Sequence, residues 1–230
     1  MFVIKLAELN IAIKNKYDYI HNMCNDYLTS DEPDFTVCAS DNEILAERNE
    51  SNEDTGYLES LAIYRKIADI LPRYTGLLLH ASVIDVLGLG VAFLAKSGVG
   101  KSTHTMLWKE LLGESVSIIN GDKPIVRVSN GKIFAYGTPW AGKENWHTNS
   151  KTELKKICFI ERSEENQCTE LNKNDVLEGL LNQVYIPKNS GDFLLTLELL
   201  DAIVENTRFY LIKCNKDIQS AKTAFKGLGL

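Results

Sequence analysis

Residues 80–103 read HASVIDVLGLGVAFLAKSGVGKST: two short apolar runs separated by a glycine turn, followed by a loop of small residues. The apolar runs predict strands at 77–86 and 91–94, joined by a turn at 87–90. Residues 101–112 after the loop have helical periodicity, and Gly113 ends them. A strand, a small-residue loop and a helix in this order direct backbone N–H groups at an anion.

The loop follows the Walker A pattern, except that Ala95 stands where the pattern begins with glycine. An alanine is compatible with that position if its φ stays negative. Lys101 is expected to contact the β- and γ-phosphates, and the Ser102 hydroxyl to bind Mg²⁺. The alternative is a glycine turn that happens to precede Lys-Ser-Thr. The sequence predicts ATP and Mg²⁺ as cofactors, with the nucleotide bound by Ser97, Gly98, Val99, Gly100, Lys101, Ser102 and Thr103.

Asp122 is the second candidate, in the segment SIINGDKP at 117–124. It follows an apolar strand, about twenty residues beyond the phosphate loop, and carboxylates at strand ends can face a nucleotide in α/β folds. Asp122 is predicted to bind the metal ion or to accept the proton of a hydroxyl substrate. The alternative is an ordinary Asn-Gly-Asp turn.

Other polar residues are candidates because of their position near these motifs. His80 lies on the strand beside the loop and is predicted to contact the γ-phosphate, whereas His104 is predicted to be a packing residue. Residues 137–147 form a loop rich in turn residues, donors and tryptophans, which predicts an acceptor-binding loop or a packed surface loop. Arg162 follows a strand and is predicted either to stabilise transferred charge or to pair with a nearby glutamate. The residues predicted to contact the acceptor are Thr138, Lys143, Asn145 and Arg162.

The rest of the chain predicts one α/β domain over 1–230, with an N-terminal portion at 1–75 and a nucleotide-binding core at 76–230. The polar segment 40–56 is predicted to be mostly loop, although 43–47 could add a strand. Further strands are predicted within 2–13 and at 35–39, 116–119, 125–128, 132–136, 157–161 and 208–213. Further helices are predicted at 17–28, 57–71, 174–184, 193–206 and from 218.

Composition narrows the class of protein. The 230 residues carry a formal net charge of −6, which argues against a general nucleic-acid binder. No signal peptide is evident, and no apolar run approaches the ~20 residues of a membrane helix. The five cysteines are expected to be reduced thiols, with Cys38, Cys158 and Cys214 in the core. These features predict a cytoplasmic protein and leave its oligomeric state open.

Over about residues 77–128, the histidine, the glycine hairpin and the sequence SGVGKS resemble the C-terminal kinase domain of HPr kinase/phosphorylase, a bacterial serine kinase. The resemblance implies a phosphoenolpyruvate carboxykinase-like P-loop fold with mixed β-sheets flanked by helices. It implies that His80 hydrogen-bonds the transferring phosphate. Gly121 stands where the family has the first residue of an Asp-Asp pair, which leaves the general base open. Residues 136–164 resemble stand-alone members of the family that accompany peptide-modifying systems, including lasso peptide clusters.

The expected function is an ATP- and Mg²⁺-dependent kinase whose acceptor is a serine hydroxyl on a peptide, a small protein or free serine. One alternative is a catalytically silent nucleotide-binding partner in a peptide-maturation complex, which Ala95 and Gly121 favour. A carboxykinase that decarboxylates oxaloacetate is a third reading. Its families are longer and carry further metal ligands and arginines that have no counterpart identified in this chain.

Overall fold

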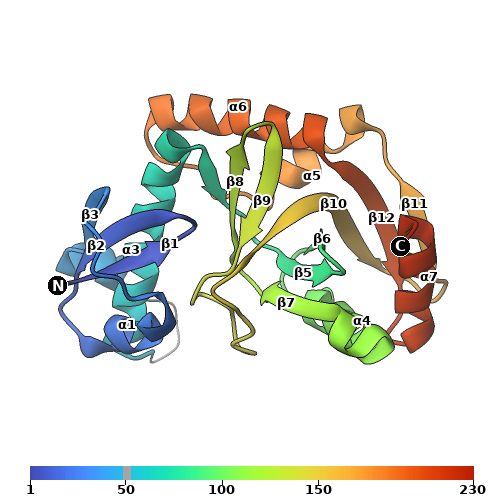
Figure 1. The fold of residues 1–230 in the computed structure, drawn as a ribbon, viewed down its shortest axis with the longest axis horizontal. Coiled ribbons are helices and arrows are strands. Elements are labelled where there is room, and N and C mark those ends of the chain that lie inside the picture. The colour runs from blue at the N-terminus through green and yellow to red at the C-terminus, as the bar shows by residue number, and fades with distance from the viewer. Residues whose placement is uncertain (49–52) are drawn as a thin grey trace.

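The computed structural model describes residues 1–48 and 53–230, so that 49–52 of the predicted 40–56 loop lie outside the described residues. The described chain forms a three-stranded sheet and a nine-stranded sheet with helices around them (Figure 1). The prediction of an α/β fold with mixed sheets flanked by helices is confirmed, whereas the carboxykinase-like P-loop assignment and the single domain over 1–230 stay predictions. No helix of the described part combines the length and the apolar character needed to cross a membrane.

The bounds of the elements follow chain order. The strands are β1 Phe2–Leu6, β2 Leu9–Lys14, β3 Phe35–Cys38, β4 Gly76–Leu78, β5 Ser82–Val86, β6 Leu89–Leu94, β7 Val116–Asn120, β8 Ile125–Ser129, β9 Lys132–Tyr136, β10 Lys151–Arg162, β11 Gln167–Glu170 and β12 Arg208–Cys214. The α-helices are α1 Asp18–Met23, α2 Asp41–Ala46, α3 Thr55–Ile70, α4 Lys101–Leu112, α5 Leu177–Leu181, α6 Ser190–Asn206 and α7 Ile218–Leu228. Short 3₁₀ turns occupy Asn25–Tyr27, Leu71–Tyr74, Gly113–Ser115 and Lys173–Asp175.

The large sheet is organised around β6, the strand that leads into the phosphate loop. It pairs antiparallel with β5 on one side and parallel with β10 on the other. β10 is shared, because its first residues pair with β9 and its later residues pair in parallel with β12. The full order is β4-β8-β9-β10-β6-β5-β7, with β12 and β11 added beside β10. The loop therefore starts from an interior strand that is held on both edges.

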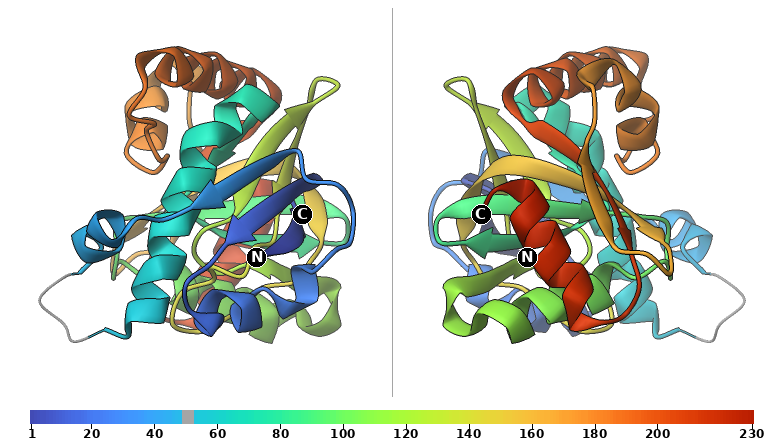
Figure 2. Two further views of the ribbon diagram at one scale, coloured as in Figure 1. Left: turned by 90° about the vertical axis from the view of Figure 1, so that its left-hand side faces the viewer. Right: turned by 90° about the vertical axis from the view of Figure 1, so that its right-hand side faces the viewer.

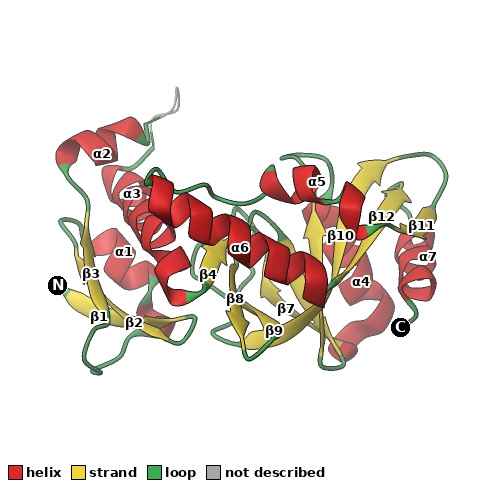
Figure 3. Cartoon of the chain, turned by 90° about the horizontal axis from the view of Figure 1, so that it is seen from above, coloured by secondary structure: helices red, strands yellow, loops and turns green. Residues whose placement is uncertain are grey.

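The central strands of this sheet are buried on both sides because helices cover both faces. Val91 and Phe93 of β6 pack on one face with Trp108 of α4 and residues of α7, whereas Ala92 and Leu94 face the opposite core. This alternation is the period of two expected for a strand. α4 and α7 lie side by side on one face (Figure 2, right), and α6 crosses above β8 and β9 (Figure 3).

The structure corrects several sequence-based predictions. The segment 43–47 is not a strand; it lies in α2, which begins with a reciprocal capping box between Ser40 and Glu43. The predicted strand 77–86 is two strands, because the backbone N–H groups at 79–81 donate to carbonyl groups of Pro124, Gln183 and Asp122 instead of a sheet neighbour.

Three further differences concern edges of the fold. β10 is much longer than the predicted 157–161, and only Leu177–Leu181 of the predicted helix 174–184 is α-helical. The edge strand β11 was not predicted, since only one of its residues is even partly buried and its sequence has no apolar alternation. Cys38 is exposed, unlike the buried Cys158 and Cys214.

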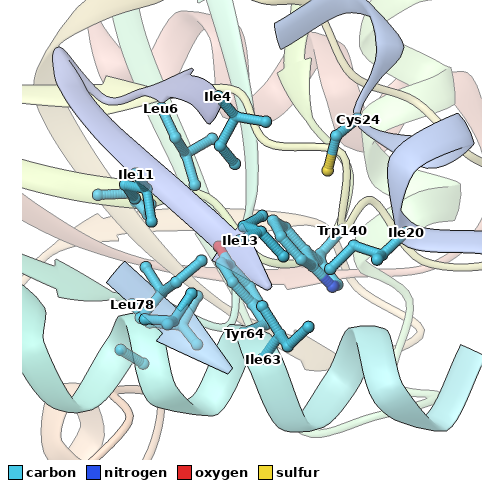
Figure 4. Close-up of a cluster of buried hydrophobic side chains, with 14 of the residues drawn as sticks. Ile4, Leu6, Ile11, Ile13, Ile20, Cys24, Ile63, Tyr64, Leu78 and Trp140 are labelled. Atoms are coloured by element: carbon cyan, nitrogen blue, oxygen red, sulfur yellow. The ribbon is translucent and has the colours of Figure 1, made fainter. Parts of the chain in front are cut away.

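Two contacts position α3, one with the 137–147 loop and one within the N-terminal portion. Tyr64 of α3 stacks on Trp140, with ring centroids 3.9 Å apart (Figure 4), and the indole N–H donates to the Ser60 carbonyl group at 3.1 Å. Glu59 of α3 is fully buried, and its carboxylate accepts the backbone N–H groups of Lys16 and Tyr17 at 2.6 and 3.0 Å. These contacts fix α3 and the β2–α1 connection, both of which reach the pocket described below.

We expect Glu59→Ala to lower the free energy of unfolding by about 3 kcal/mol, because it leaves two backbone N–H groups without their acceptor. Urea denaturation followed by circular dichroism measures this change. Glu198→Gln, at an exposed position of α6, is the control and should change stability by less than about 0.5 kcal/mol. Equal stabilities of the two variants would contradict the anchoring role of Glu59.

Candidate functional site

A pocket of about 760 Å³ lies beside the N-terminus of α4. The phosphate loop and the 121–123 turn bound one side of it, residues 139–145 bound another, and the N-terminal helices close the third. Its lining comprises Tyr19, Met23, Tyr57, Leu61, His80, Ser97, Gly98, Gly100, Lys101, Ser102, Thr103, Gly121, Asp122, Lys123, Pro139, Trp140, Ala141, Gly142, Lys143, Glu144 and Asn145. Its volume is in the range of small-molecule sites.

The phosphate loop has the backbone geometry that its glycines predict. Gly98 and Gly100 have φ angles of 77° and 138°, which residues with a Cβ atom rarely adopt. Ala95 is not among the described non-glycine residues with positive φ, so the missing first glycine of the pattern is accommodated without strain. The loop is partly exposed and leads directly into the first turn of α4, where unpaired N–H groups and the helix dipole favour an anion.

Lys101, His80 and Asp122 form a connected polar cluster in this pocket. The Lys101 Nζ lies 3.0 Å from His80 Nε2 and donates to the Ala95 carbonyl group at 2.9 Å. The same His80 Nε2 lies 3.3 Å from a carboxylate oxygen of Asp122, whose other oxygen is 3.3 Å from Lys123 Nζ. Residues from three separate segments of the sequence thus meet at one end of the loop.

The electrostatics of the cluster favour a charged carboxylate. Burial raises the pKa of Asp122, but the hydrogen bond from His80 and the charge of Lys123 outweigh it and bring the pKa to about 2. Burial lowers the pKa of Lys101, and the charge of Asp122 opposes that effect. A carboxyl group with so low a pKa is a weak base at neutral pH, which suits it to cation binding better than to proton abstraction.

A buried amide positions Asp122. The Asn120 side chain is fully buried at the end of β7, and its oxygen accepts the backbone N–H groups of Asp122 and Lys123 at 2.8 and 2.7 Å. Its NH₂ group donates to the carbonyl group and the hydroxyl of Thr138 at 2.9 and 3.1 Å. Asn120 therefore joins the turn that carries Asp122 to the start of the 137–147 loop.

The structure separates the residues predicted to contact the acceptor. Lys143 and Asn145 line the pocket, whereas Thr138 is fully buried behind it and donates to the Lys123 carbonyl group at 2.9 Å. Arg162, at the end of β10, lies behind the phosphate loop, where its guanidinium donates to the carbonyl groups of Gly98 and Val99. Its place supports the loop from outside the pocket lining.

The remaining predicted residues lie in or next to the loop. Ser102 and Thr103 line the pocket, while the Val99 side chain packs against the core beneath. His104 is buried and accepts the Trp108 indole N–H at 3.0 Å, the contact of a packing residue. A Cβ atom at Gly121 would lie 3.1 Å from the Ala141 carbonyl oxygen, so a larger residue there would press on the 137–147 loop.

Sequence reasoning missed the wall that faces the loop. Tyr19 and Met23 come from α1, and Tyr57 and Leu61 come from α3. Tyr19 and Tyr57 meet edge to face with centroids 5.9 Å apart. No local pattern marks these residues, because the N-terminal helices reach the pocket only through tertiary packing.

The described residues contain no group of three or more His, Cys, Asp or Glu side chains arranged to hold a metal ion. Mg²⁺ in nucleotide sites is usually held by one or two protein oxygens, the phosphates and water. Ser102 and Asp122 both line the pocket and supply oxygens of that kind, so the donors present fit Mg²⁺ bound with a triphosphate.

The sequence matches no protein-family model, and a search of curated proteins finds no match. Among solved structures, the chain is similar to the HPr(Ser) kinase/phosphatase from Coxiella burnetii, at 13% sequence identity and a TM-score of 0.32. The alignment covers 54% of this chain and 93% of that chain. At this TM-score the likeness is weak, and the function proposed below rests on the geometry of the pocket.

The lowered pKa of Asp122 has a testable cause. Because its folded-state pKa lies below the ordinary 3.8, the ionised carboxylate stabilises the fold above about pH 4, and that contribution is lost as the pH falls toward 2. Lys123→Ala and His80→Ala should each raise the midpoint, since burial then acts with less opposition. Carboxyl ¹³C NMR of the Asp122 signal follows the titration. Lys216→Ala, at an exposed position outside the pocket lining, should leave the midpoint unchanged. An unchanged midpoint in all three variants would refute the role of His80 and Lys123 in lowering the pKa of Asp122.

Proposed function

We propose that this chain is an ATP- and Mg²⁺-dependent kinase, active in the cytoplasm, that transfers the γ-phosphate to a serine hydroxyl on a peptide, a small protein or free serine. The observation that carries the proposal is the cluster of Lys101, His80 and Asp122 in the same pocket as the phosphate loop. Phosphoryl transfer depends mainly on positioning and on charge stabilisation, and this cluster supplies groups of both signs at the helix N-terminus.

Each group has a role that follows from its place. The loop N–H groups and Lys101 hold the β- and γ-phosphates, and Ser102 and Asp122 hold Mg²⁺, which neutralises charge that develops between these phosphates. His80 contacts the transferring phosphate through Nε2, the atom that now lies near both Lys101 and Asp122. Arg162 keeps the loop in place from behind, and Lys143 and Asn145 face the substrate side of the pocket.

The alternative is a nucleotide-binding partner protein in a peptide-maturation complex that binds ATP without transferring phosphate. One observation favours it: the cluster holds a single carboxylate, and Gly121 beside it leaves little room for a second one. A single carboxylate of low pKa binds a cation well and accepts a proton poorly. Transfer measurements separate the two functions.

Incubation with γ-labelled ATP, Mg²⁺, free serine and serine-containing peptides tests the kinase. We expect Lys101→Ala and Asp122→Asn to reduce transfer at least ~100-fold, because each removes charge that stabilises the transition state. Calorimetry should show weaker ATP binding for Lys101→Ala, and a weaker Mg²⁺ effect on binding for Asp122→Asn.

Lys96→Ala is the matched control, because Lys96 is an exposed lysine of the same loop outside the pocket lining. It should retain transfer within a few-fold of the unmodified protein. Tight ATP binding without transfer to any acceptor would instead support the silent partner protein. Full transfer by Asp122→Asn would remove the proposed role of that carboxylate.

A further inference from the structure

A second pocket, of about 460 Å³, adjoins the first one. The two pockets share four lining residues, Tyr57, Leu61, His80 and Lys123. The other walls of the second pocket come from α3, the end of β4, the segment 182–185 and three residues before α3, namely Ala46, Glu47 and Glu53. Its lining adds Ala46, Glu47, Glu53, Tyr64, Arg65, Leu78, Asn182, Gln183, Val184 and Tyr185. The cluster residue His80 thus faces the phosphate loop on one side and a separate chamber on the other.

One charged side chain of this chamber has no ion-pair partner among the described residues. Arg65 forms an ion pair with Glu47, and Lys123 forms one with Asp122. Within the described residues Glu53 has no ion-pair partner, so its carboxylate is the one charged group of the lining that is left unpaired. Burial, and next the charge of Glu53, raise the pKa of Tyr57, which places Glu53 close to the residue that joins the two pockets.

The unpaired hydrogen-bonding atoms of the lining also call for a group that donates hydrogen bonds. A carboxylate oxygen of Glu53 and the side-chain oxygen of Gln183 are both buried without a partner among the described residues. Both residues line the second pocket, and both unpaired atoms are acceptors. Buried acceptors without partners are rare in folded proteins, so an occupant that donates hydrogen bonds is the expected complement. An ammonium group is both a hydrogen-bond donor and a cation, so it is the complement of the unpaired Glu53 carboxylate and of the Gln183 oxygen alike.

We propose that the second pocket binds the phosphate acceptor, and that the acceptor carries an ammonium group near the hydroxyl it presents to His80. This inference rests on the proposed kinase function, because it names the acceptor of the same site. Tyr57, Tyr64 and Tyr185 add aromatic groups to the lining, a composition that favours a cation. The ammonium group of a free amino acid and the N-terminus of a peptide share this chemistry.

An acceptor in the second pocket would approach the γ-phosphate from the side that phosphoryl transfer requires. The nucleotide occupies the loop side, so the hydroxyl must approach the γ-phosphorus from the side away from the leaving oxygen. The hydroxyl oxygen forms a bond to phosphorus, and the bond from phosphorus to the bridging oxygen breaks with its electron pair left on ADP. The hydroxyl proton is released to water, because the Asp122 carboxylate, with its pKa of about 2, is a poor proton acceptor.

Binding without nucleotide tests the chamber independently of catalysis. The probes are L-serinamide and N-acetyl-L-serinamide, which share a hydroxyl and a carboxamide and differ in the ammonium group. Titration followed by NMR should show at least tenfold tighter binding of L-serinamide. Glu53→Gln and Gln183→Leu should each weaken that binding about tenfold and leave ATP binding unchanged. Glu32→Gln, at an exposed position outside both pocket linings, is the control and should change neither.

Equal binding of the two probes, or equal binding by Glu53→Gln, Gln183→Leu and the unmodified chain, would overturn the inference. Transfer to a peptide serine that persists in both variants would overturn it too, while the kinase function would stand. Selective L-serinamide binding in a protein that binds ATP and transfers no phosphate would support the chamber and remove the kinase function. Comparing L-serinamide with a peptide that begins with serine distinguishes the two sources of the ammonium group.

Discussion

The arrangement of the site depends on the buried amide of Asn120. Its oxygen accepts the N–H groups of two successive residues, and its NH₂ group donates to Thr138 on a different segment. An apolar residue of the same size would leave these buried groups unpaired, and an aspartate would lack the donors. One side chain therefore sets the position of the Asp122 carboxylate and the place where the 137–147 loop leaves the sheet. The Asp122 carboxylate and the 137–147 loop therefore move together if the Asn120 side chain is disturbed.

The parts that could be predicted from the sequence are those in which local pattern and tertiary structure agree. The phosphate loop, α4 and the flanking strands are contiguous, and their glycines and apolar periods determine their conformation. Asp122 was recognised because it follows a strand in the expected order. Its contact with His80 was not predicted, since that contact is made between residues that follow separate strands. Arg162 is the opposite case. The sequence predicts that this cation contacts the acceptor, whereas in the structure it supports the phosphate loop from outside the pocket.

The rest depended on contacts that no local pattern records. The break at 79–81 arises because that backbone pairs with the 122–124 turn and with Gln183. The aromatic wall of the first pocket exists because Trp140 stacks on Tyr64 of α3, and Glu59 of α3 holds the connection that leads into α1. Both pockets meet along α3, so a helix whose sequence is that of an ordinary amphipathic segment forms the boundary between the proposed nucleotide side and the proposed acceptor side.

The interior position of β6 has a consequence for how the molecule is made. The chain is synthesised from its N-terminus, so β6 and the phosphate loop leave the ribosome before β10, which holds one edge of β6, and well before β12, which extends the sheet beyond β10. Parallel pairings between distant segments form slowly, because a long loop must close first. The phosphate loop therefore gains its rigid base only after β10 and β12 have been made. An incomplete chain would carry the motif in its sequence without the geometry to use it.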